Sequence, residues 1–268
     1  MSTRGHSTAI VDPRAELAGG VEGGPYAVIG PEVRIGPECR IGAHAVLDGR
    51  VTMGRGNRIF PGACIGLEPQ DLKYTGDPTG VLLGDDNTIR ECVTINRATQ
   101  DNQVTTLGSG NLLMAYSHLG HNCLLGDRIV IANAVAVAGH VQIADRAVIG
   151  GVLGIHQFVH IGTLAMVGGM SRIERDVPPF TMVEGHPARV RALNRIGLQR
   201  HGLAERDGGR QLEDLKRAWT LIYRRGLPLA ESLAQLRSDS LSAAAEELVA
   251  FLEASQAAGR RGPIPGSR

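Results

Sequence analysis

An aliphatic residue occupies every sixth position from Leu107 to Ile173 without an exception. A helix repeats every 3.6 residues and a strand every second residue, so neither alone keeps a period of six. A second small or β-branched residue usually stands two positions earlier, as Cys123 does before Leu125. Alternate residues of a strand share a face, so each hexad predicts a short strand with two inward side chains, followed by a turn. The period is typical of a hexapeptide β-helix, in which short strands stack into a solenoid.

The six-residue phase extends toward the N-terminus and is interrupted twice. It is regular from Ile29 to Ile65 and resumes at Leu83. Residues 66–82 and 100–104 instead carry mostly polar residues, Pro and Gly. Insertions in a solenoid project on one side and often carry function. With three hexads per coil, we expect about nine coils and two projecting loops.

The C-terminal part has a different period. Leu212, Leu215 and Trp219 recur at helix spacing, and Gly226 follows them as a stop signal. Two more helices are expected around residues 233–236 and 248–252. We therefore predict a β-helix domain over residues 1–188 and a small α-helical domain over residues 189–268, with a disordered tail from Gly259.

Charge and composition narrow the functional classes. Only 3% of the residues are aromatic, which suits the narrow interior of a solenoid. Residues 189–268 hold half of the 28 lysines and arginines but a third of the 27 aspartates and glutamates. This basic end is either a solvated helical face or a docking surface for an acidic protein partner. We find no signal peptide and no membrane-spanning stretch, and we expect a cytoplasmic protein without a nucleic-acid partner.

The four cysteines do not form a metal-binding or disulfide pattern. They stand apart, at Cys39, Cys64, Cys92 and Cys123. Cys39 and Cys123 belong to the inward set of the repeat. We expect packed thiols in a reducing compartment.

The repeat predicts which polar residues meet. Residues 18 apart occupy the same place on successive coils, about 4.8 Å from each other. His121, Gly139 and Gln157 form one such column, and His140 belongs to the next. His118 shares the hexad edge of His121. These side chains should converge on one edge of the solenoid, with a gap above His121 for substrate and the Gly139 N–H facing a reacting carbonyl.

Three interpretations of these histidines compete. A single histidine in a turn is usually only a solvated polar residue, but three in adjacent columns around a glycine favour a site. Three histidines on a β-helix edge can bind zinc. No Asp or Glu accompanies them, however, and Gln157 and Asn122 are poor zinc ligands. We favour general-base chemistry without a metal or cofactor, since the ordinary pKa of histidine lies near neutrality.

The chain also resembles a known family. The resemblance is carried by QDLKY (70–74), RECVTINR (90–97), NLLMAYSHLGHNC (111–123), AGHV (138–141), GGVLGIHQF (150–158), MVGGMS (166–171), DVPPF (176–180) and NRIGLQRHG (194–202). These segments are similar to those of the UDP-N-acetylglucosamine O-acyltransferases, which start lipid A synthesis. The hexad repeat is shared by many transferases. The QDLKY insertion, the HLGH segment and residues 194–202 are specific to this family.

The resemblance implies a left-handed β-helix, a homotrimer, and active sites between neighbouring subunits. It implies that His121 is the general base for the sugar 3-hydroxyl, which attacks a 3-hydroxyacyl thioester on acyl carrier protein. The Gly139 N–H would stabilise the oxyanion. Gly169 would limit the acyl chain length, with glycine admitting long chains. Substrate or product would be bound by Asp71, Lys73, His118, His140, His156, Gln157, Asn194 and Arg200.

The sequence departs from the family pattern at three positions. Asn122 stands where the family often has Asp, Asn96 where some members have His, and Ile196 where some have Glu. An asparagine accepts a hydrogen bond but cannot stabilise an imidazolium by charge. Two other functions remain open at this point. One is an N-acyltransferase acting on a 3-amino UDP-sugar, and the other is a non-catalytic β-helix that binds carrier protein or nucleotide sugar.

Overall fold

The computed structural model describes residues 4–203 and 205–267. Its strands form three sheets, here called sheets 1, 2 and 3. Sheet 1 contains β1 (Arg4–Gly5), β4 (Glu22–Gly23), β7 (Arg40–Ile41), β10 (Arg58–Ile59), β13 (Thr88–Ile89), β16 (Leu112–Leu113), β19 (Val130–Ile131), β22 (Val148–Ile149), β25 (Met166–Val167), β27 (Thr181–Gly185) and β28 (Ala188–Leu193). Sheet 2 contains β2 (Ile10–Val11), β5 (Val28–Ile29), β8 (Val46–Leu47), β11 (Cys64–Ile65), β14 (Thr94–Ile95), β17 (His118–Leu119), β20 (Ala136–Val137), β23 (Gly154–Ile155) and β26 (Arg172–Ile173). Sheet 3 contains β3 (Glu16–Leu17), β6 (Arg34–Ile35), β9 (Arg50–Met53), β12 (Gly80–Leu83), β15 (Val104–Leu107), β18 (Leu124–Leu125), β21 (Gln142–Ile143) and β24 (His160–Ile161).

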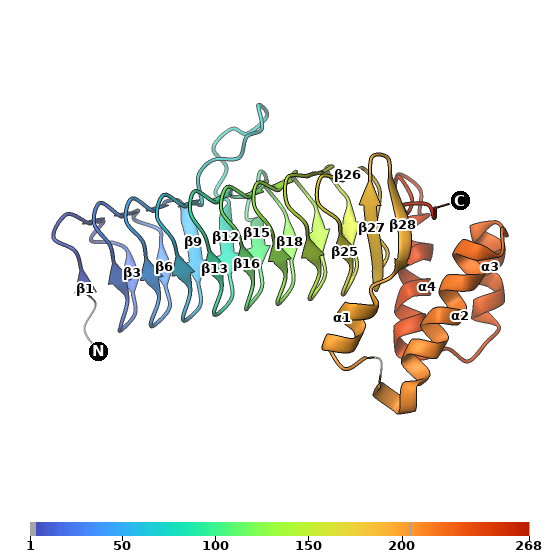
Figure 1. The fold of residues 1–268 in the computed structure, drawn as a ribbon. Helices are drawn as coiled ribbons and strands as arrows, with labels where there is room; N and C mark the ends of the chain where they lie inside the picture. The colour runs from blue at the N-terminus through green and yellow to red at the C-terminus, as the bar shows by residue number, and fades with distance from the viewer. Residues whose placement is uncertain (1–3, 204, 268) are drawn as a thin grey trace.

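The chain visits the three sheets in turn and forms one long parallel β-helix (Figure 1). Residues 18 apart pair between successive coils, as Leu112 does with Val130. The predicted repeat and its column spacing are therefore confirmed. The second residue of each central strand, such as Leu113 or Leu119, is fully buried in the core. The insertion at 100–104 lengthens one coil, so Thr94 pairs with His118, 24 residues later.

Most corners of the β-helix hold one residue in the left-handed region of backbone space. Where sheet 2 turns into sheet 3, these residues are Asn122, His140 and Phe158, with φ of 59°, 59° and 67°. Asparagine and histidine tolerate this conformation better than most residues. Because the turns repeat, the three side chains lie above one another at the same corner. The ring centres of His140 and Phe158, for example, are 4.9 Å apart.

The first insertion, between β11 and β12, projects from the β-helix as a long loop (turquoise in Figure 1). Arg97 holds its base. The guanidinium donates to the Gly66 carbonyl at 3.1 Å, to the Tyr74 hydroxyl at 3.1 Å and to the Glu68 carboxylate at 3.2 Å. The loop that carries Asp71 and Lys73 is therefore fixed to the coil that follows it.

The C-terminal part closes one end of the β-helix. Strands β27 and β28 form an antiparallel hairpin that continues sheet 1 past the expected boundary at residue 188. Four helices follow: α1 (Arg195–Arg200), α2 (Arg210–Arg224), α3 (Leu229–Arg237) and α4 (Ala243–Ser255), with a 3₁₀ turn at Arg206–Gly209. The three helices expected from the sequence correspond to α2, α3 and α4. Their apolar faces form a second core with Leu164 and Phe180 of the last coil.

The prediction of a disordered tail from Gly259 is wrong for residues 259–267. The backbone of this segment pairs with Asp176 and Val190, and the side chain of Ile264 is buried in the β-helix core. The Arg260 guanidinium forms a bidentate ion pair with Asp176, whose side chain is 5% exposed. Composition alone suggests a loose end, but the backbone of the last coil offers hydrogen-bond partners that the tail satisfies.

Candidate active site

The corner between sheets 2 and 3 brings His118, His121, Gly139 and His140 together, as the column spacing predicts. The imidazole of His121 lies directly against Gly139. A Cβ atom at position 139 would stand 2.4 Å from Cε1 of His121, which no side chain allows. The predicted gap above His121 is therefore filled by its own ring. The glycine makes room for the histidine instead of leaving a space for substrate.

The hydrogen bonds of His121 define which ring nitrogen is free. Nδ1 lies 2.9 Å from Oδ1 of Asn122. The same oxygen accepts from the backbone N–H of Thr99 at 3.2 Å, and a backbone N–H can only donate, so the amide atom facing His121 is the oxygen. Nδ1 therefore donates its proton to Asn122. Nε2 has no hydrogen-bond partner among residues 4–203 and 205–267 and presents a lone pair.

The two histidines beside His121 are in environments that favour the neutral ring. Burial, and then the proximity of His121, lower the pKa of His118. Nδ1 of His118 is also bonded to the Thr94 hydroxyl at 2.7 Å. Burial and His121 lower the pKa of His140 too, while the charge of Asp71 acts in the opposite direction. Neutral neighbours spare His121 from like-charge repulsion when it takes up a proton.

The backbone N–H of Gly139 is available as a donor. It gives no hydrogen bond to any group in the described part of the chain, although the carbonyl of the same residue accepts from Phe158 N–H at 3.2 Å. Because the glycine adjoins the His121 ring, a proton acceptor and a hydrogen-bond donor lie side by side. Such a pair can bind a hydroxyl and a developing oxyanion.

An apolar groove of about 440 Å³ runs along sheet 2 from this corner. It begins at His118, passes the small residues Ala136 and Gly154, and ends at Arg172. His156 borders it, exposed to solvent, and its Nε2 lies 3.2 Å from the guanidinium of Arg261 in the C-terminal tail. The groove can hold an extended apolar chain with one end beside the histidines.

Other predicted site residues lie near the corner without sharing its hydrogen bonds. Gln157 is half-buried in the column of Gly139. Asp71 lies close enough to His140 to act on its pKa, and its carboxylate accepts from the Lys73 backbone N–H at 3.0 Å. The Lys73 side chain is exposed.

Three predicted site residues lie away from the corner of sheets 2 and 3. Gly169 is exposed between β25 and β26, at the corner of sheets 1 and 2. Asn194 caps α1: Oδ1 accepts from Gly197 N–H at 3.0 Å, and Nδ2 donates to Leu164 O at 2.8 Å. Arg200 ends the same helix. A single chain does not bring these residues to His121.

Sequence reasoning missed the residues that hold Asn122. Its amide also receives the Thr99 hydroxyl at 2.9 Å and donates to Oε1 of Gln103. The interruption of the hexad period at 100–104 was the available signal. The contact of Arg261 with His156 had no signal in the sequence.

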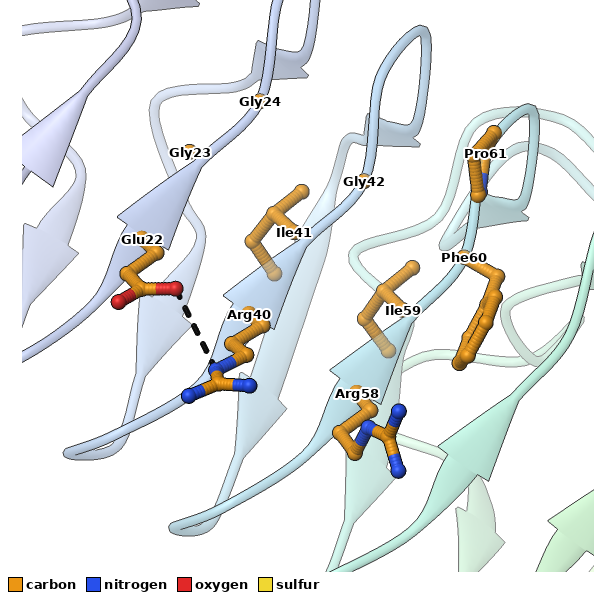
Figure 2. A pocket seen from close by; sticks show the side chains of 10 residues that line it. All are labelled: Glu22, Gly23, Gly24, Arg40, Ile41, Gly42, Arg58, Ile59, Phe60 and Pro61. Atoms are coloured by element: carbon orange, nitrogen blue, oxygen red, sulfur yellow. Dashed lines mark ion pairs between the residues drawn. The ribbon is translucent and has the colours of Figure 1, made fainter.

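A second groove, of about 370 Å³, lies far from these histidines along the first coils (Figure 2). Figure 2 shows Glu22, Arg40 and Arg58 in a row on neighbouring strands of sheet 1. Arg40 pairs with Glu22 at 3.3 Å, and the Arg58 guanidinium lies 5.4 Å from the ring centre of Phe60. These contacts satisfy the charges of an exposed sheet face, and the lining contains no histidine or cysteine.

Within the described ranges, no three His, Cys, Asp or Glu side chains are arranged to hold a metal ion. In the same ranges, no helix has the length and apolar character needed to cross a bilayer.

The stacked hexads, the free Nε2 of His121 and the free backbone N–H of Gly139 indicate a β-helix acyltransferase. A family model described as UDP-N-acetylglucosamine O-acyltransferase, domain 2, matches residues 176–264. The acyl-[acyl-carrier-protein]–UDP-N-acetylglucosamine O-acyltransferase of Rippkaea orientalis is 59% identical over 83% of this chain and 80% of its own length. The enzyme of the same name from Synechocystis is 54% identical over 83% of this chain and 80% of its own length.

Solved structures give the same result. The structure of LpxA from Acinetobacter baumannii matches with a TM-score of 0.90 and 40% identity, covering 97% of this chain and 99% of that one. The UDP-N-acetylglucosamine acyltransferase of Arabidopsis matches with a TM-score of 0.80 and 31% identity over 97% and 99%. The chain therefore belongs to the acyl-[acyl-carrier-protein]–UDP-N-acetylglucosamine O-acyltransferase family, and its fold is the left-handed parallel β-helix of that family.

Proposed function

We propose that this protein transfers a 3-hydroxyacyl chain from acyl carrier protein to the 3-hydroxyl of UDP-N-acetylglucosamine, the first step of lipid A synthesis. The observation that carries the proposal is the state of His121. Its Nδ1 is engaged by Asn122, its Nε2 lone pair is free, and the unpaired Gly139 N–H lies against its ring. The substrates are inferred from the names of the relatives, and the catalytic steps are inferred from the geometry of His121 and Gly139.

In the proposed reaction, Nε2 of His121 takes the proton of the sugar hydroxyl while its oxygen attacks the thioester carbonyl. The tetrahedral oxyanion is stabilised by the N–H of Gly139. The C–S bond then breaks, and the imidazolium returns the proton to the departing thiolate. The neutral His118 and His140 add no positive charge that would oppose protonation of the base. No cofactor enters these steps, because positioning, a base and an oxyanion donor suffice.

We also propose that the protein is a cytoplasmic homotrimer, and the placement of the other predicted site residues favours active sites shared between subunits. Gly169 lies at the corner of sheets 1 and 2, and Asn194 and Arg200 belong to the ends of α1, so none of the three lies at the His121 corner of the same chain. A symmetric trimer with parallel β-helices sets one corner of each subunit against a different corner of the next. In this arrangement Asp71, Lys73, His156 and Gln157 bind substrate near the base. Asn194, Arg200 and Gly169 would come from a neighbouring subunit.

Gly169 is proposed to set the acyl chain length. It is exposed, and a side chain there would first meet the Gly151 carbonyl, at 3.1 Å from Cβ. Without a side chain, the groove between subunits stays open for a long chain, and each buried CH₂ contributes about 0.8 kcal/mol. A long 3-hydroxyacyl donor should therefore be preferred in competition with a short one.

The decisive test is His121→Ala in an assay with 3-hydroxyacyl carrier protein and UDP-N-acetylglucosamine. Loss of a general base lowers turnover by about 10²–10⁴-fold. A variant that stays trimeric with near-normal turnover would refute the role of His121. Mass spectra of products from UDP-N-acetylglucosamine and its 3-amino analogue separate O-acylation from N-acylation. Binding of both substrates without any product identifies a non-catalytic module.

A further inference from the structure

The orientation of the Asn122 amide decides whether His121 can act as a base. A neutral imidazole carries one proton, on either Nδ1 or Nε2. An amide has an acceptor end and a donor end. With Oδ1 toward His121, the proton stays on Nδ1 and Nε2 is free. With Nδ2 toward His121, Nδ1 must accept, and the proton moves to Nε2, where no base remains.

The loop at residues 98–103 fixes this orientation from the far side. The Thr99 hydroxyl donates to Oδ1 of Asn122 at 2.9 Å, and the Thr99 backbone N–H donates to the same oxygen at 3.2 Å. Oε1 of Gln103 accepts from Nδ2 of Asn122. The Gln103 amide is itself oriented, because its Nε2 donates to Oε1 of Gln100 at 3.0 Å. Both ends of the Asn122 amide are thereby specified.

Backbone hydrogen bonds attach the loop to the neighbouring insertion and strand β12. The Gly80 N–H donates to the Gln103 carbonyl at 3.1 Å, and the Asn102 N–H donates to the Pro78 carbonyl at 3.2 Å. The backbone N–H of Asn122 donates to Oγ1 of the buried Thr105 at 2.9 Å. The insertion that interrupts the hexad period is therefore attached to the residue that orients the base.

We propose that Thr99 and Gln103 are positioning residues, which hold the Asn122 amide with its oxygen toward Nδ1 of His121 and so keep Nε2 unprotonated. This proposal rests on the proposed role of His121 as the base. It also gives a reason for the loop in this chain. A carboxylate at position 122 would accept through either oxygen, whereas an asparagine needs its two ends distinguished.

The test compares the wild-type protein with the double variant Thr99→Val, Gln103→Leu. The free protein is labelled with ¹⁵N-histidine, and the His121 signals are assigned with His121→Gln. Protonated and bare imidazole nitrogens have different ¹⁵N shifts, so the tautomer is read without substrate. We expect a proton on Nδ1 in the wild type and a shift of population toward Nε2–H in the double variant. A wild-type proton on Nε2, or an unchanged tautomer in the variant, would overturn the proposal.

Turnover gives the second readout. We expect kcat of the double variant to fall about tenfold with KM for the sugar nucleotide unchanged, as the loss of one or two net hydrogen bonds gives. Thr99→Ser keeps the hydroxyl and should retain wild-type kcat. In the Asn122→Asp background the same two substitutions should cost less than twofold, and an undiminished loss there overturns the proposal. Thr52→Val, on an exposed face of β9, is the matched control for both readouts.

The tautomer measurement is independent of acyl transfer. If the wild-type protein forms no acylated sugar, the proposed function fails, while the ¹⁵N spectra still decide how the loop orients Asn122.

Discussion

The thiol of Cys123 donates a hydrogen bond to the carbonyl oxygen of Ala138, with a sulfur–oxygen distance of 3.1 Å. This carbonyl belongs to the same peptide unit as the N–H of Gly139. A peptide unit is planar, so fixing the carbonyl inside the core also fixes the direction in which the N–H points. The buried cysteine therefore supports the proposed oxyanion donor from below.

Replacing Cys123 by alanine should lower kcat about two- to tenfold, since one net hydrogen bond contributes about 0.5–1.5 kcal/mol. Cys39→Ala is the control, because that thiol donates to the Gly54 carbonyl at the same 3.1 Å, far from the histidines. Cys123→Ser keeps a donor and should retain more activity than the alanine variant. Equal turnover of Cys123→Ala and wild type would show that the thiol has no such role.

The thiols should also differ in reactivity. Burial raises the pKa of Cys123 to about 12, so almost no thiolate forms at pH 8. Cys92 is exposed. Iodoacetamide at pH 8 should alkylate Cys92 and leave Cys123 unmodified in the folded protein, as read by peptide mass spectrometry. Rapid modification of Cys123 would contradict the packing described for the core.

Gly139→Ala should abolish most activity without unfolding the chain. The new Cβ would lie 2.4 Å from Cε1 and 2.5 Å from Nε2 of His121, so the ring must leave its place. We expect kcat to fall at least as far as for loss of the base, about 10²–10⁴-fold. The control is Gly23→Ala, where the nearest atom to the new Cβ is Gly5 Cα at 3.7 Å. Wild-type activity in the Gly139→Ala variant would show that the position of the His121 ring against Gly139 is not needed for catalysis.

The ion pair between Arg260 and Asp176 should matter more than any surface pair. Asp176 also accepts from Ser255 at 2.5 Å and from the His160 backbone N–H at 2.8 Å. Arg260→Met leaves a buried carboxylate uncompensated and should destabilise the protein by about 3 kcal/mol. The double variant Arg260→Met, Asp176→Asn should recover part of this loss. Thermal melts at one fixed protein concentration would decide, and a double variant as unstable as the single one would contradict the argument.

Stability should fall as the pH is lowered below about 6.5. Burial depresses the pKa of His118, His140 and His160 in the folded protein, so the unfolded chain binds protons first. The stabilising contribution is complete above the unfolded pKa, near 6.5, and is lost as pH falls through the folded values. The melting temperature should drop between pH 7 and 5. The melting temperature of the His118→Gln variant should drop less over this range than that of the wild type. An equal drop would exclude His118 as a contributor.

The regular part of this molecule is predictable because each coil contacts only its neighbours. Positions such as Leu113 and Leu119 follow from the period alone, and so does the meeting of His121 with Gly139. The positions of Asp71 and Thr99 do not follow, because loops outside the repeat are placed by specific contacts such as those of Arg97. Asn194 shows a different limit. The family resemblance predicts a substrate-binding role for Asn194, but it does not predict that the Asn194 side chain caps α1.

The tail that packs against Asp176 and Val190 covers part of the last coil of the solenoid. A parallel β-helix whose final coil is bare presents unpaired backbone groups, to which further strands can add. Here the hairpin β27–β28 ends sheet 1, and residues 262–266 occupy hydrogen-bonding positions beside it. The same segment thus acts as a terminator: it occupies backbone groups at this end of the repeat to which a further strand could otherwise add.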